Sequence, residues 1–412
     1  MTDFLDQAET CDPDERERAL FGRLPDVIAY ACDNAAGWRA HLAGVDPAAI
    51  VNRAALSSLP LLRKADLMAD QAKAPPFGGF ATLSAGQAAR VFMSPGPIFE
   101  PQPEGADAWN AARALFAAGL RKGNLVHNAF AYHMTPGGFI LDQGAIALGC
   151  SVFPAGAGNT EAQVQAMAAL RPDAYVGTPD YLKVILDQAA ESGADVSSLK
   201  KALVSGGALF PSLRAHYAAR GVAVLQTYAT AELGCIAYET AADTGLVINE
   251  DYIVEIVTPG TGDPVPDGEV GEVVVTAFKK NYPMIRLATG DLSAILPGQS
   301  PCGRTNRRIR GWLGRADQRT KVKGMFIDPK QVADIARALA GAGLGRMRLV
   351  VRRMNEKDVV TLQAEAEHHT SDLSKALAAA FRDHCKMKAD IELVRPGTLP
   401  NDGKVIADER QY

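Results

Sequence analysis

Tyr282–Asp291, which reads YPMIRLATGD, is the stretch around which this chain of 412 residues is organised. It ends in a tight Thr-Gly turn and an aspartate, and the segment GRAD follows at residues 314–317. A carboxylate directly after a tight turn can accept two hydrogen bonds from a ribose diol, and a guanidinium nearby adds donors to the same nucleotide. Asp291 and Arg315 are therefore candidate nucleotide-binding residues. An ordinary turn and a surface ion pair are the alternative for such short segments.

The order and spacing of these segments, with KVKG at residues 321–324, resemble the adenylate-forming superfamily of acyl-CoA synthetases, and most closely its short branch, the phenylacetate-CoA ligases. The resemblance extends over nearly the whole chain. It implies an acid:CoA ligase that uses ATP, Mg²⁺ and coenzyme A, and it implies a homodimer. It also implies that Asp317 is the hinge of a mobile lid and that Lys321 and Gly324 lie beside the channel for coenzyme A.

A chain of 412 residues is longer than one hydrophobic core ordinarily organises, which indicates more than one domain. The composition, with 47% hydrophobic and 22% charged residues, indicates a globular protein. The net charge of −4 shows no excess of basic residues of the kind that binds nucleic acid. No apolar run approaches the roughly 18 residues that a membrane-spanning helix needs. We expect a small-molecule carboxylate as partner, and neither nucleic acid nor membrane. The acidic N-terminus lacks a secretory signal, which predicts a cytoplasmic protein. The six cysteines form no Cys-x-x-Cys pair, so structural zinc is not expected.

Alternating strand and helix patterns predict an α/β fold. Residues 14–71 have helical spacing and predict an N-terminal helical layer. Five short apolar strands alternate with helices in residues 124–227, which predicts a doubly wound, mostly parallel sheet whose ligands bind beyond the carboxyl ends of the strands. Short β segments and Pro/Gly/Asp turns in residues 236–300 predict a β-rich subdomain. We expect a large N-terminal domain, residues 1–316, and a small α+β C-terminal lid domain, residues 317–412.

A glycine turn follows one predicted strand of this sheet. Ser205, Gly206 and Gly207 resemble the turn that runs along the adenine in the family, and glycine lets the backbone approach a flat ring closely. The resemblance therefore implies that these three residues bind the nucleotide.

A second motif, QTYATAE at residues 226–232, leaves the next predicted strand and resembles the family's aromatic-x-x-Thr/Ser-Glu motif. On that match Tyr228 stacks on adenine, and Ala229 and Thr230 add contacts to the nucleotide. Glu232 would be a catalytic residue that binds Mg²⁺, a hard cation that prefers carboxylate oxygen. A helix-capping pair with a core tyrosine is the alternative.

The segment Ser94–Pro101, SPGPIFEP, departs most from the family. Relatives carry a Ser/Thr/Gly-rich loop that ends in Gly-Lys-Pro and holds the β and γ phosphates of ATP. Ser94 and Gly96 match this loop, but its prolines remove amide donors, and Glu100 puts a negative charge where the lysine would meet phosphate. We expect a degenerate phosphate loop that holds the far end of ATP weakly.

Near the C-terminus, Pro400–Lys404 (PNDGK) resembles the superfamily's Pro-x-x-x-Gly-Lys segment, one residue shorter. The resemblance implies that Lys404 is catalytic and bridges the carboxylate substrate and the nucleotide phosphate, where a cation stabilises the charge on the pentacoordinate phosphorus. Rotation of the lid would then take it out of the site. A solvated lysine of the C-terminal tail is the alternative.

Family alignment places four residues around the carboxylate substrate: Phe130, Tyr132, His133 and Tyr181. Aromatic side chains there suit an apolar or aromatic acid. Core packing explains Phe130 and Tyr181 equally well, and His133 is either a donor to the carboxylate or a structural histidine.

Three hypotheses for the function follow. The favoured one is an AMP-forming acid:CoA ligase that activates an apolar or aromatic carboxylate through an acyl-adenylate. The second is a degenerate, non-catalytic homologue that binds nucleotide or acyl-CoA, and the third is a transferase of the same fold with a different acceptor. The retained Asp291, Arg315, Glu232 and Lys404 favour catalysis, because a mere binder has little need of the lysine, whereas residues 95–100 favour the second hypothesis.

Overall fold

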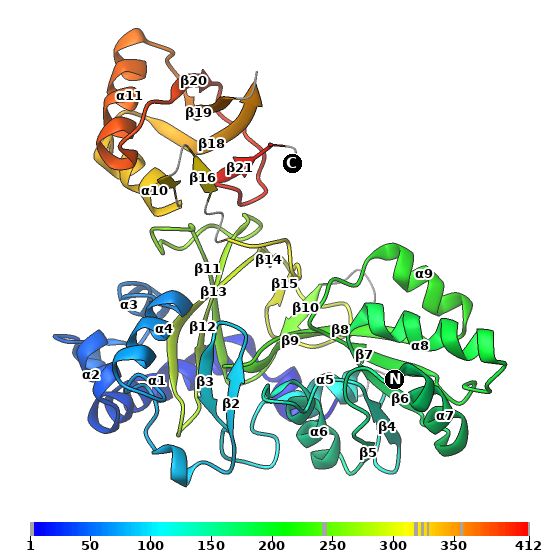
Figure 1. Ribbon diagram of the computed structural model, residues 1–412. Coiled ribbons are helices and arrows are strands. Elements are labelled where there is room, and N and C mark those ends of the chain that lie inside the picture. Colours follow the sequence, from blue (N-terminus) through cyan, green and yellow to red (C-terminus); the bar gives the residue numbers. More distant parts are fainter. Residues whose placement is uncertain are drawn as a thin grey trace. The chain divides into compact units, whose positions relative to one another are not determined.

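The structure is a computed structural model (Figure 1), and it describes residues 4–240, 245–316, 320–322, 325–327, 329–354 and 357–410. The chain packs as two compact units. The first unit comprises Met1–Val254, Val275–Leu287 and Leu296–Trp312, and the second comprises Glu255–Val274, Ala288–Ile295 and Leu313–Tyr412.

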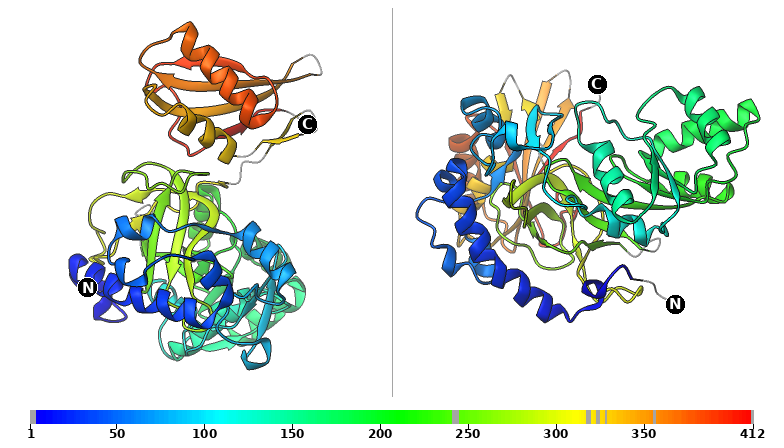
Figure 2. Two further views of the ribbon diagram at one scale, coloured as in Figure 1. Left: turned by 90° about the vertical axis from the view of Figure 1, so that its left-hand side faces the viewer. Right: turned by 90° about the horizontal axis from the view of Figure 1, so that it is seen from below.

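The predicted N-terminal helical layer is present in the first unit. Its helices are α1 (Pro13–Asn34), α2 (Ala36–His41), α3 (Arg53–Ser57) and α4 (Lys64–Lys73), with 3₁₀ turns at Gln7–Thr10, Pro47–Ala49 and Ala85–Gln87. The Asp12 carboxylate caps α1 by accepting hydrogen bonds from the amides of Asp14 and Glu15. Figure 2 shows α1 in dark blue along the outside of this unit. None of the helices in the described part of the chain is long and apolar enough to span a bilayer.

A nine-stranded sheet forms the centre of the α/β fold. In the order β14-β15-β10-β9-β8-β7-β6-β4-β5, its strands are Ile295–Leu296, Arg308–Ile309, Leu246–Ile248, Gly234–Glu239, Ala223–Thr230, Lys201–Val204, Ala174–Gly177, Leu125–Asn128 and Ser151–Phe153. Strands β5, β4, β6, β7 and β8 are parallel, and β9, β10 and β15 continue the sheet antiparallel. The five predicted strands are these five parallel ones.

Helices cover both faces of the parallel part, as predicted. They are α5 (Ala111–Ala117), α6 (Gly137–Ala147), α7 (Thr160–Leu170), α8 (Pro179–Ser192) and α9 (Pro211–Ala219). Alternate residues of one strand enter different cores: Ala174 and Val176 of β6 pack with α5 and α6, whereas Tyr175 packs with α7, α8 and α9. Local sequence fixes the ends of α8, because Pro179 suits a first helical turn and Gly193 takes the left-handed conformation after the last one. The sheet is therefore doubly wound.

The β-rich part contains a four-stranded sheet in the order β1-β13-β12-β11 and a separate hairpin, β2–β3. The strands are β1 (Leu62–Arg63), β11 (Tyr252–Val257), β12 (Gly271–Ala277), β13 (Met284–Ser293), β2 (Val91–Ser94) and β3 (Ile98–Pro101). The sequence predicted a tight turn at Thr289–Gly290, and the structure corrects this, because both residues lie within β13. Gly290 takes a φ of +75° inside this strand, a conformation that glycine adopts without steric cost.

The second unit contains an α+β body. Its elements are β16 (Thr320–Val322), β17 (Met325–Ile327), α10 (Pro329–Ala338), β18 (Leu344–Met354), β19 (Lys357–Ala366), α11 (Ser371–Cys385), β20 (Asp390–Val394) and β21 (Ile406–Asp408). The larger sheet has the order β20-β19-β18-β21. Val332 and Ile335 of α10 and Phe381 of α11 are buried against its face.

Candidate active site

The carboxyl ends of the parallel strands in the first unit bring the predicted glycine turn next to a predicted substrate residue. Ser205 and Gly206 follow β7, Phe130 follows β4, and Thr178 follows β6. Gly206 has a φ of +72°, and a Cβ added to it would lie 3.6 Å from Cε1 of Phe130 and 3.7 Å from Cγ2 of Thr178. The Ser205 hydroxyl donates to the Thr227 carbonyl at 2.7 Å, which ties the turn to β8. The turn and the aromatic ring therefore share one edge of the sheet.

The predicted nucleotide motif forms the β8–β9 hairpin. Tyr228 lies in β8, half-buried, and the register with β9 shifts between Tyr228 and Ala229. Such a bulge increases the local twist and redirects the following side chains. The hydroxyl of Thr230 is buried and has no hydrogen-bond partner among the described residues. Glu232 lies in the turn that connects the two strands.

Glu232 is 2% exposed and forms an ion pair that the sequence did not indicate. Nζ of Lys64 lies 2.8 Å from Oε1 and 3.0 Å from Oε2 of Glu232, so one ammonium contacts both carboxylate oxygens. Lys64 is the first residue of α4, within the predicted N-terminal helical layer. No local pattern reveals a partner that lies 168 residues away.

The predicted phosphate loop is a tight hairpin. The sequence predicts one loop over Ser94–Pro101, but Ser94 pairs with Ile98 across the exposed turn Pro95–Pro97, and residues 98–101 form β3. Helix α4 holds this hairpin, because the Gln71 side chain accepts from the amide of Phe99 and donates to its carbonyl, both at 2.8 Å.

Glu100 therefore lies in a strand and not in the loop that was predicted to bring its charge to the phosphates. It is 2% exposed, and its Oε1 accepts a hydrogen bond from the Ser94 hydroxyl at 2.6 Å. Its Oε2 has no hydrogen-bond partner within the described residues. Burial, with the nearby negative charge of Glu232, raises the pKa of Glu100 to about 8, and Ser94 and Lys64 oppose this shift.

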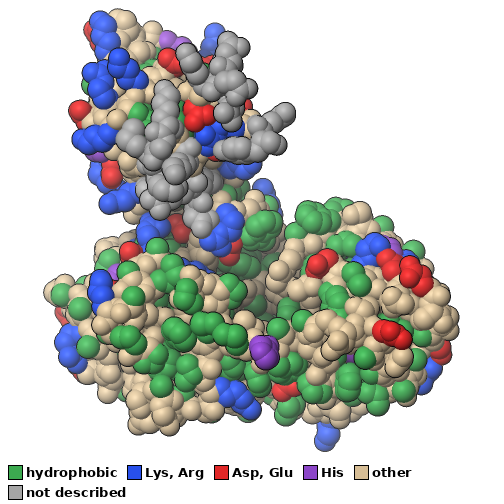
Figure 3. Space-filling view, in the orientation of Figure 1, with side chains coloured by type: hydrophobic (Ala, Val, Ile, Leu, Met, Phe, Trp, Pro, Cys, Tyr) green, Lys and Arg blue, Asp and Glu red, His purple; other side chains and the backbone are tan. Residues whose placement is uncertain are grey.

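The remaining predicted substrate residues are not all grouped with Phe130. The Tyr132 hydroxyl accepts from Nδ2 of Asn128 at 2.8 Å and donates to Asp142 at 3.0 Å, and burial beside Asp142 raises its pKa. His133 is exposed. Figure 3 shows that hydrophobic side chains cover much of the visible face of the first unit.

Tyr181 belongs to the core on the other face of the sheet. Its hydroxyl donates to the Gly158 carbonyl at 2.7 Å and lies 3.2 Å from Nε2 of Gln163, whose Oε1 contacts the buried His127 at 2.8 Å. The structure thus gives Tyr181 a packing environment apart from Phe130, which corresponds to the alternative that the sequence left open.

In the second unit, Asp291 and Arg315 lie together. Oδ1 of Asp291 is 3.1 Å from Nη1 of Arg315, and the two side chains are 13% and 49% exposed. Gly290 makes this approach feasible, because a Cβ added there would lie only 2.5 Å from Nη2 of Arg315. The amide of Asp291 donates to the Thr289 hydroxyl at 3.2 Å. The carboxylate and guanidinium are thus presented as a pair at a partly exposed position.

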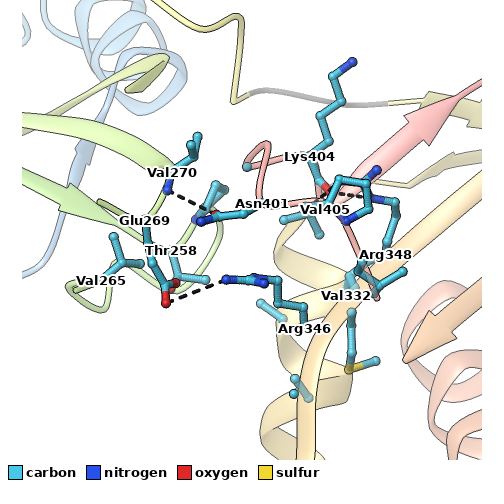
Figure 4. A pocket seen from close by; sticks show the side chains of 18 residues that line it. Thr258, Val265, Glu269, Val270, Val332, Arg346, Arg348, Asn401, Lys404 and Val405 are labelled. Atoms are coloured by element: carbon cyan, nitrogen blue, oxygen red, sulfur yellow. Dashed lines mark hydrogen bonds and ion pairs between the residues drawn. The ribbon is translucent and has the colours of Figure 1, made fainter. Parts of the chain in front are cut away.

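Lys404 lies on a loop of the second unit that Arg348 holds in place. Nε of Arg348 donates to the Lys404 carbonyl at 3.0 Å, and its guanidinium pairs with Asp402. The Lys404 side chain is exposed, and Figure 4 shows its ammonium directed away from the other labelled side chains. Gly403 has a φ of +69°, and a Cβ added there would lie 2.6 Å from Cγ1 of Val270.

The loop borders a cavity of about 310 Å³ in the second unit (Figure 4). Its walls are mainly apolar, with Val265, Val270 and Val332 among them. Arg346 lies 3.7 Å from Glu269 on one side of it. The structure thus places Lys404 at the rim of an apolar cavity with a few charged groups.

Some predicted site residues cannot be located. Asp317 and Gly324 lie outside the described residues, and Lys321 is described only as part of β16, without its side chain. Among the described residues no cluster of three or more His, Cys, Asp and Glu side chains is placed to hold a metal ion. The buried oxygens of Glu232 and Glu100, one of them without a partner, are nevertheless the hard donors that suit Mg²⁺.

Comparison with known proteins identifies the family. A family model described as AMP-binding enzyme matches residues 132–277. The phenylacetate-coenzyme A ligase of Thermus thermophilus is 30% identical over 94% of this chain and 94% of its own length, and that of Pseudomonas putida is 32% identical over 97% and 95%. A crystal structure of 2-hydroxyisobutyryl-CoA ligase in the postadenylation state, in complex with 2-HIB-AMP, matches with a TM-score of 0.72 and 27% identity over 98% of this chain and 91% of that one. The chain therefore belongs to the phenylacetate-coenzyme A ligase family and is an AMP-forming CoA ligase.

Proposed function

We propose that the protein activates an apolar or aromatic carboxylate with ATP and transfers the acyl group to coenzyme A. The observation that carries this proposal is the position of Phe130 beside Gly206, at the edge of the sheet where the nucleotide motif begins. A substrate whose carboxylate is joined to the nucleotide there would place its apolar part against the aromatic ring. The names of the relatives, which include a phenylacetate and a 2-hydroxyisobutyryl ligase, are consistent with a small organic acid.

In the first step a carboxylate oxygen attacks the α-phosphorus, and pyrophosphate leaves. In this proposal the Ser205–Gly207 turn and Tyr228 bind the adenine, and Asp291 with Arg315 binds the ribose. Lys404 stabilises the charge that develops on the phosphorus. Glu232 would hold Mg²⁺, which neutralises charge on the leaving pyrophosphate.

In the second step the coenzyme A thiolate attacks the acyl carbon, and AMP leaves. We propose that the lid, residues 317–412, rotates about Asp317 between the steps, so that Lys404 leaves and Lys321 and Gly324 approach the coenzyme A channel. A homodimer in the cytoplasm completes the proposal, and light scattering on the purified protein tests its oligomeric state.

The substrate class is tested by incubating the protein with ATP, Mg²⁺, coenzyme A and one acid at a time: phenylacetate, benzoate, 2-hydroxyisobutyrate or acetate. AMP is measured by chromatography and acyl-CoA by mass spectrometry. We expect equal amounts of both products and a kcat/KM at least about tenfold higher for the aromatic acids than for acetate. Phe130→Ala is expected to reduce that preference. If no acid supports AMP formation or ATP–pyrophosphate exchange, the non-catalytic alternative is favoured.

A further inference from the structure

We propose that Glu100 is a second carboxylate ligand of the divalent cation held by Glu232, and that the Lys64 ammonium occupies the cation's position when none is bound. The inference rests on the proposed role of Glu232 and adds a ligand and an exchange step to it. Lys64, Glu100 and Glu232 all belong to the first unit.

The ammonium of Lys64 is placed as a bound cation would be. It contacts both oxygens of the buried Glu232 carboxylate, at 2.8 Å and 3.0 Å. Its side chain is 31% exposed, whereas that of Glu232 is 1% exposed, so the lysine can swing towards solvent while the carboxylate stays in place. A metal ion that arrives from solvent can therefore replace it without rearrangement of the core.

Glu100 supplies an oxygen atom that is available to coordinate a metal ion. Its Oε1 is held by the Ser94 hydroxyl at 2.6 Å, which fixes the carboxyl group, and its buried Oε2 has no hydrogen-bond partner among the described residues. A buried oxygen without a partner is costly unless a ligand satisfies it. The Thr230 hydroxyl, two residues before Glu232, is also buried and has no hydrogen-bond partner among the residues that the structure describes. It is a third hard oxygen of the kind that Mg²⁺ accepts.

Helix α4 contacts Glu232 and the neighbour of Glu100, and Glu100 lies near enough to Glu232 and Lys64 to interact with their charges. Lys64 at the first residue of α4 contacts Glu232, and Gln71 on the same helix holds Phe99, the neighbour of Glu100, by two hydrogen bonds of 2.8 Å. Charge favours the exchange, because one ammonium balances only the charge of Glu232, whereas a divalent cation stabilises the ionised form of both carboxylates. A second carboxylate would also compensate for the Pro95–Pro97 turn, which offers few amide donors to the phosphates that usually help to hold the metal ion.

The test measures Mn²⁺ binding to the nucleotide-free protein by electron paramagnetic resonance of the free ion. We expect the wild type to bind one Mn²⁺ and Glu100→Gln to bind it at least tenfold more weakly. Lys64→Met is expected to bind it more tightly, because the competing ammonium is gone. Glu104→Gln, the same change at an exposed residue four positions along the chain, is expected to bind as the wild type does.

Equal affinity of the wild type and Glu100→Gln, or no Mn²⁺ binding by the wild type without nucleotide, would overturn the proposal. Circular dichroism checks the fold of each variant. If Glu100→Gln is unfolded, Glu100→Asp against Glu104→Asp decides, since the shorter carboxylate is expected to weaken binding and the control is not. The ligase assay is independent of this titration, so acid activation without the metal site, or the reverse, separates the two proposals.

Discussion

At the scale of single residues, the buried Glu100 makes the stability of the protein depend on pH. Its pKa of about 8 in the folded protein stands against an ordinary value of 4.5, so the folded state keeps a proton that the unfolded chain loses as pH rises between these values. The free energy of unfolding therefore falls over that range, by at most about 1.4 kcal/mol for each pH unit. We expect Glu100→Gln to remove this fall, so that its stability relative to the wild type increases from pH 5 to pH 8.

Urea unfolding in the presence of a chelator measures this effect, and Glu104→Gln serves as the exposed control. A constant difference between Glu100→Gln and the wild type across this pH range would show that Glu100 is already ionised in the folded protein.

Asp291 provides a second prediction at this scale. A ribose diol that donates to its carboxylate makes charge-assisted hydrogen bonds, whose loss costs about 1.5 to 3 kcal/mol. Asp291→Ala is expected to weaken AMP and ATP binding alike, since both contain the ribose, and calorimetry with AMP can resolve the change. Asp195→Ala, which removes an exposed carboxylate from the first unit, is the matched control. Unchanged AMP affinity in Asp291→Ala would exclude it from the ribose site.

At the scale of elements, the β2–β3 hairpin distinguishes this chain from a protein with a long phosphate loop. Its turn contains Pro95 and Pro97, which have no amide hydrogen, and no lysine. We therefore expect ATP to bind little more tightly than AMP when Mg²⁺ is absent, because the phosphates beyond the first gain few contacts. Calorimetry with AMP and a non-hydrolysable ATP analogue compares the two affinities, and a hundredfold preference for the analogue would mean that another segment grips these phosphates.

The hairpin also contains a feature that the local sequence does not predict, namely the length of its turn. The prolines and the missing lysine were readable, but the length of the turn depends on the pairing of Ser94 with Ile98 and on the clamp from Gln71, which are set by packing. Glu100 was consequently predicted to lie in a loop, whereas it lies in β3. A lysine in its place would bury a second ammonium near Lys64 instead of facing phosphate.

At the scale of the whole molecule, the parallel sheet and its helices were predictable, because each strand and helix carries its own hydrophobic period. The glycine turn follows β7 as predicted, whereas Tyr228, Ala229 and Thr230 lie within β8 and not after its end. The Lys64–Glu232 ion pair was not predictable, because it joins residues far apart in the chain and only the folded sheet makes them neighbours. Tyr181, partly buried, packs against the core on the other face of the sheet from the core that Phe130 contacts, and local sequence does not distinguish these two faces.

Substitution of Lys404 tests the proposed two-step mechanism. Because this lysine is proposed to act only before the lid rotates, Lys404→Ala is expected to slow adenylation about a hundredfold or more and to leave thioester formation from presynthesised acyl-adenylate nearly intact. Pyrophosphate exchange reports the first step, and acyl-CoA release reports the second. Lys388→Ala, an exposed lysine of the same body, is the control. Equal loss of both steps would contradict a lid with two working positions.

The conformation of Gly403 limits how this region can evolve. Its φ of +69° disfavours every other residue, and the space for a Cβ is already filled by Val270 and Leu292. In a saturation library selected for acyl-CoA formation, we expect codon 403 to remain glycine in nearly all survivors, while the exposed Asn401 next to it tolerates a wide range of residues. Sequencing before and after selection would measure this contrast. The short loop that carries the proposed catalytic lysine can therefore change in sequence only around one fixed glycine.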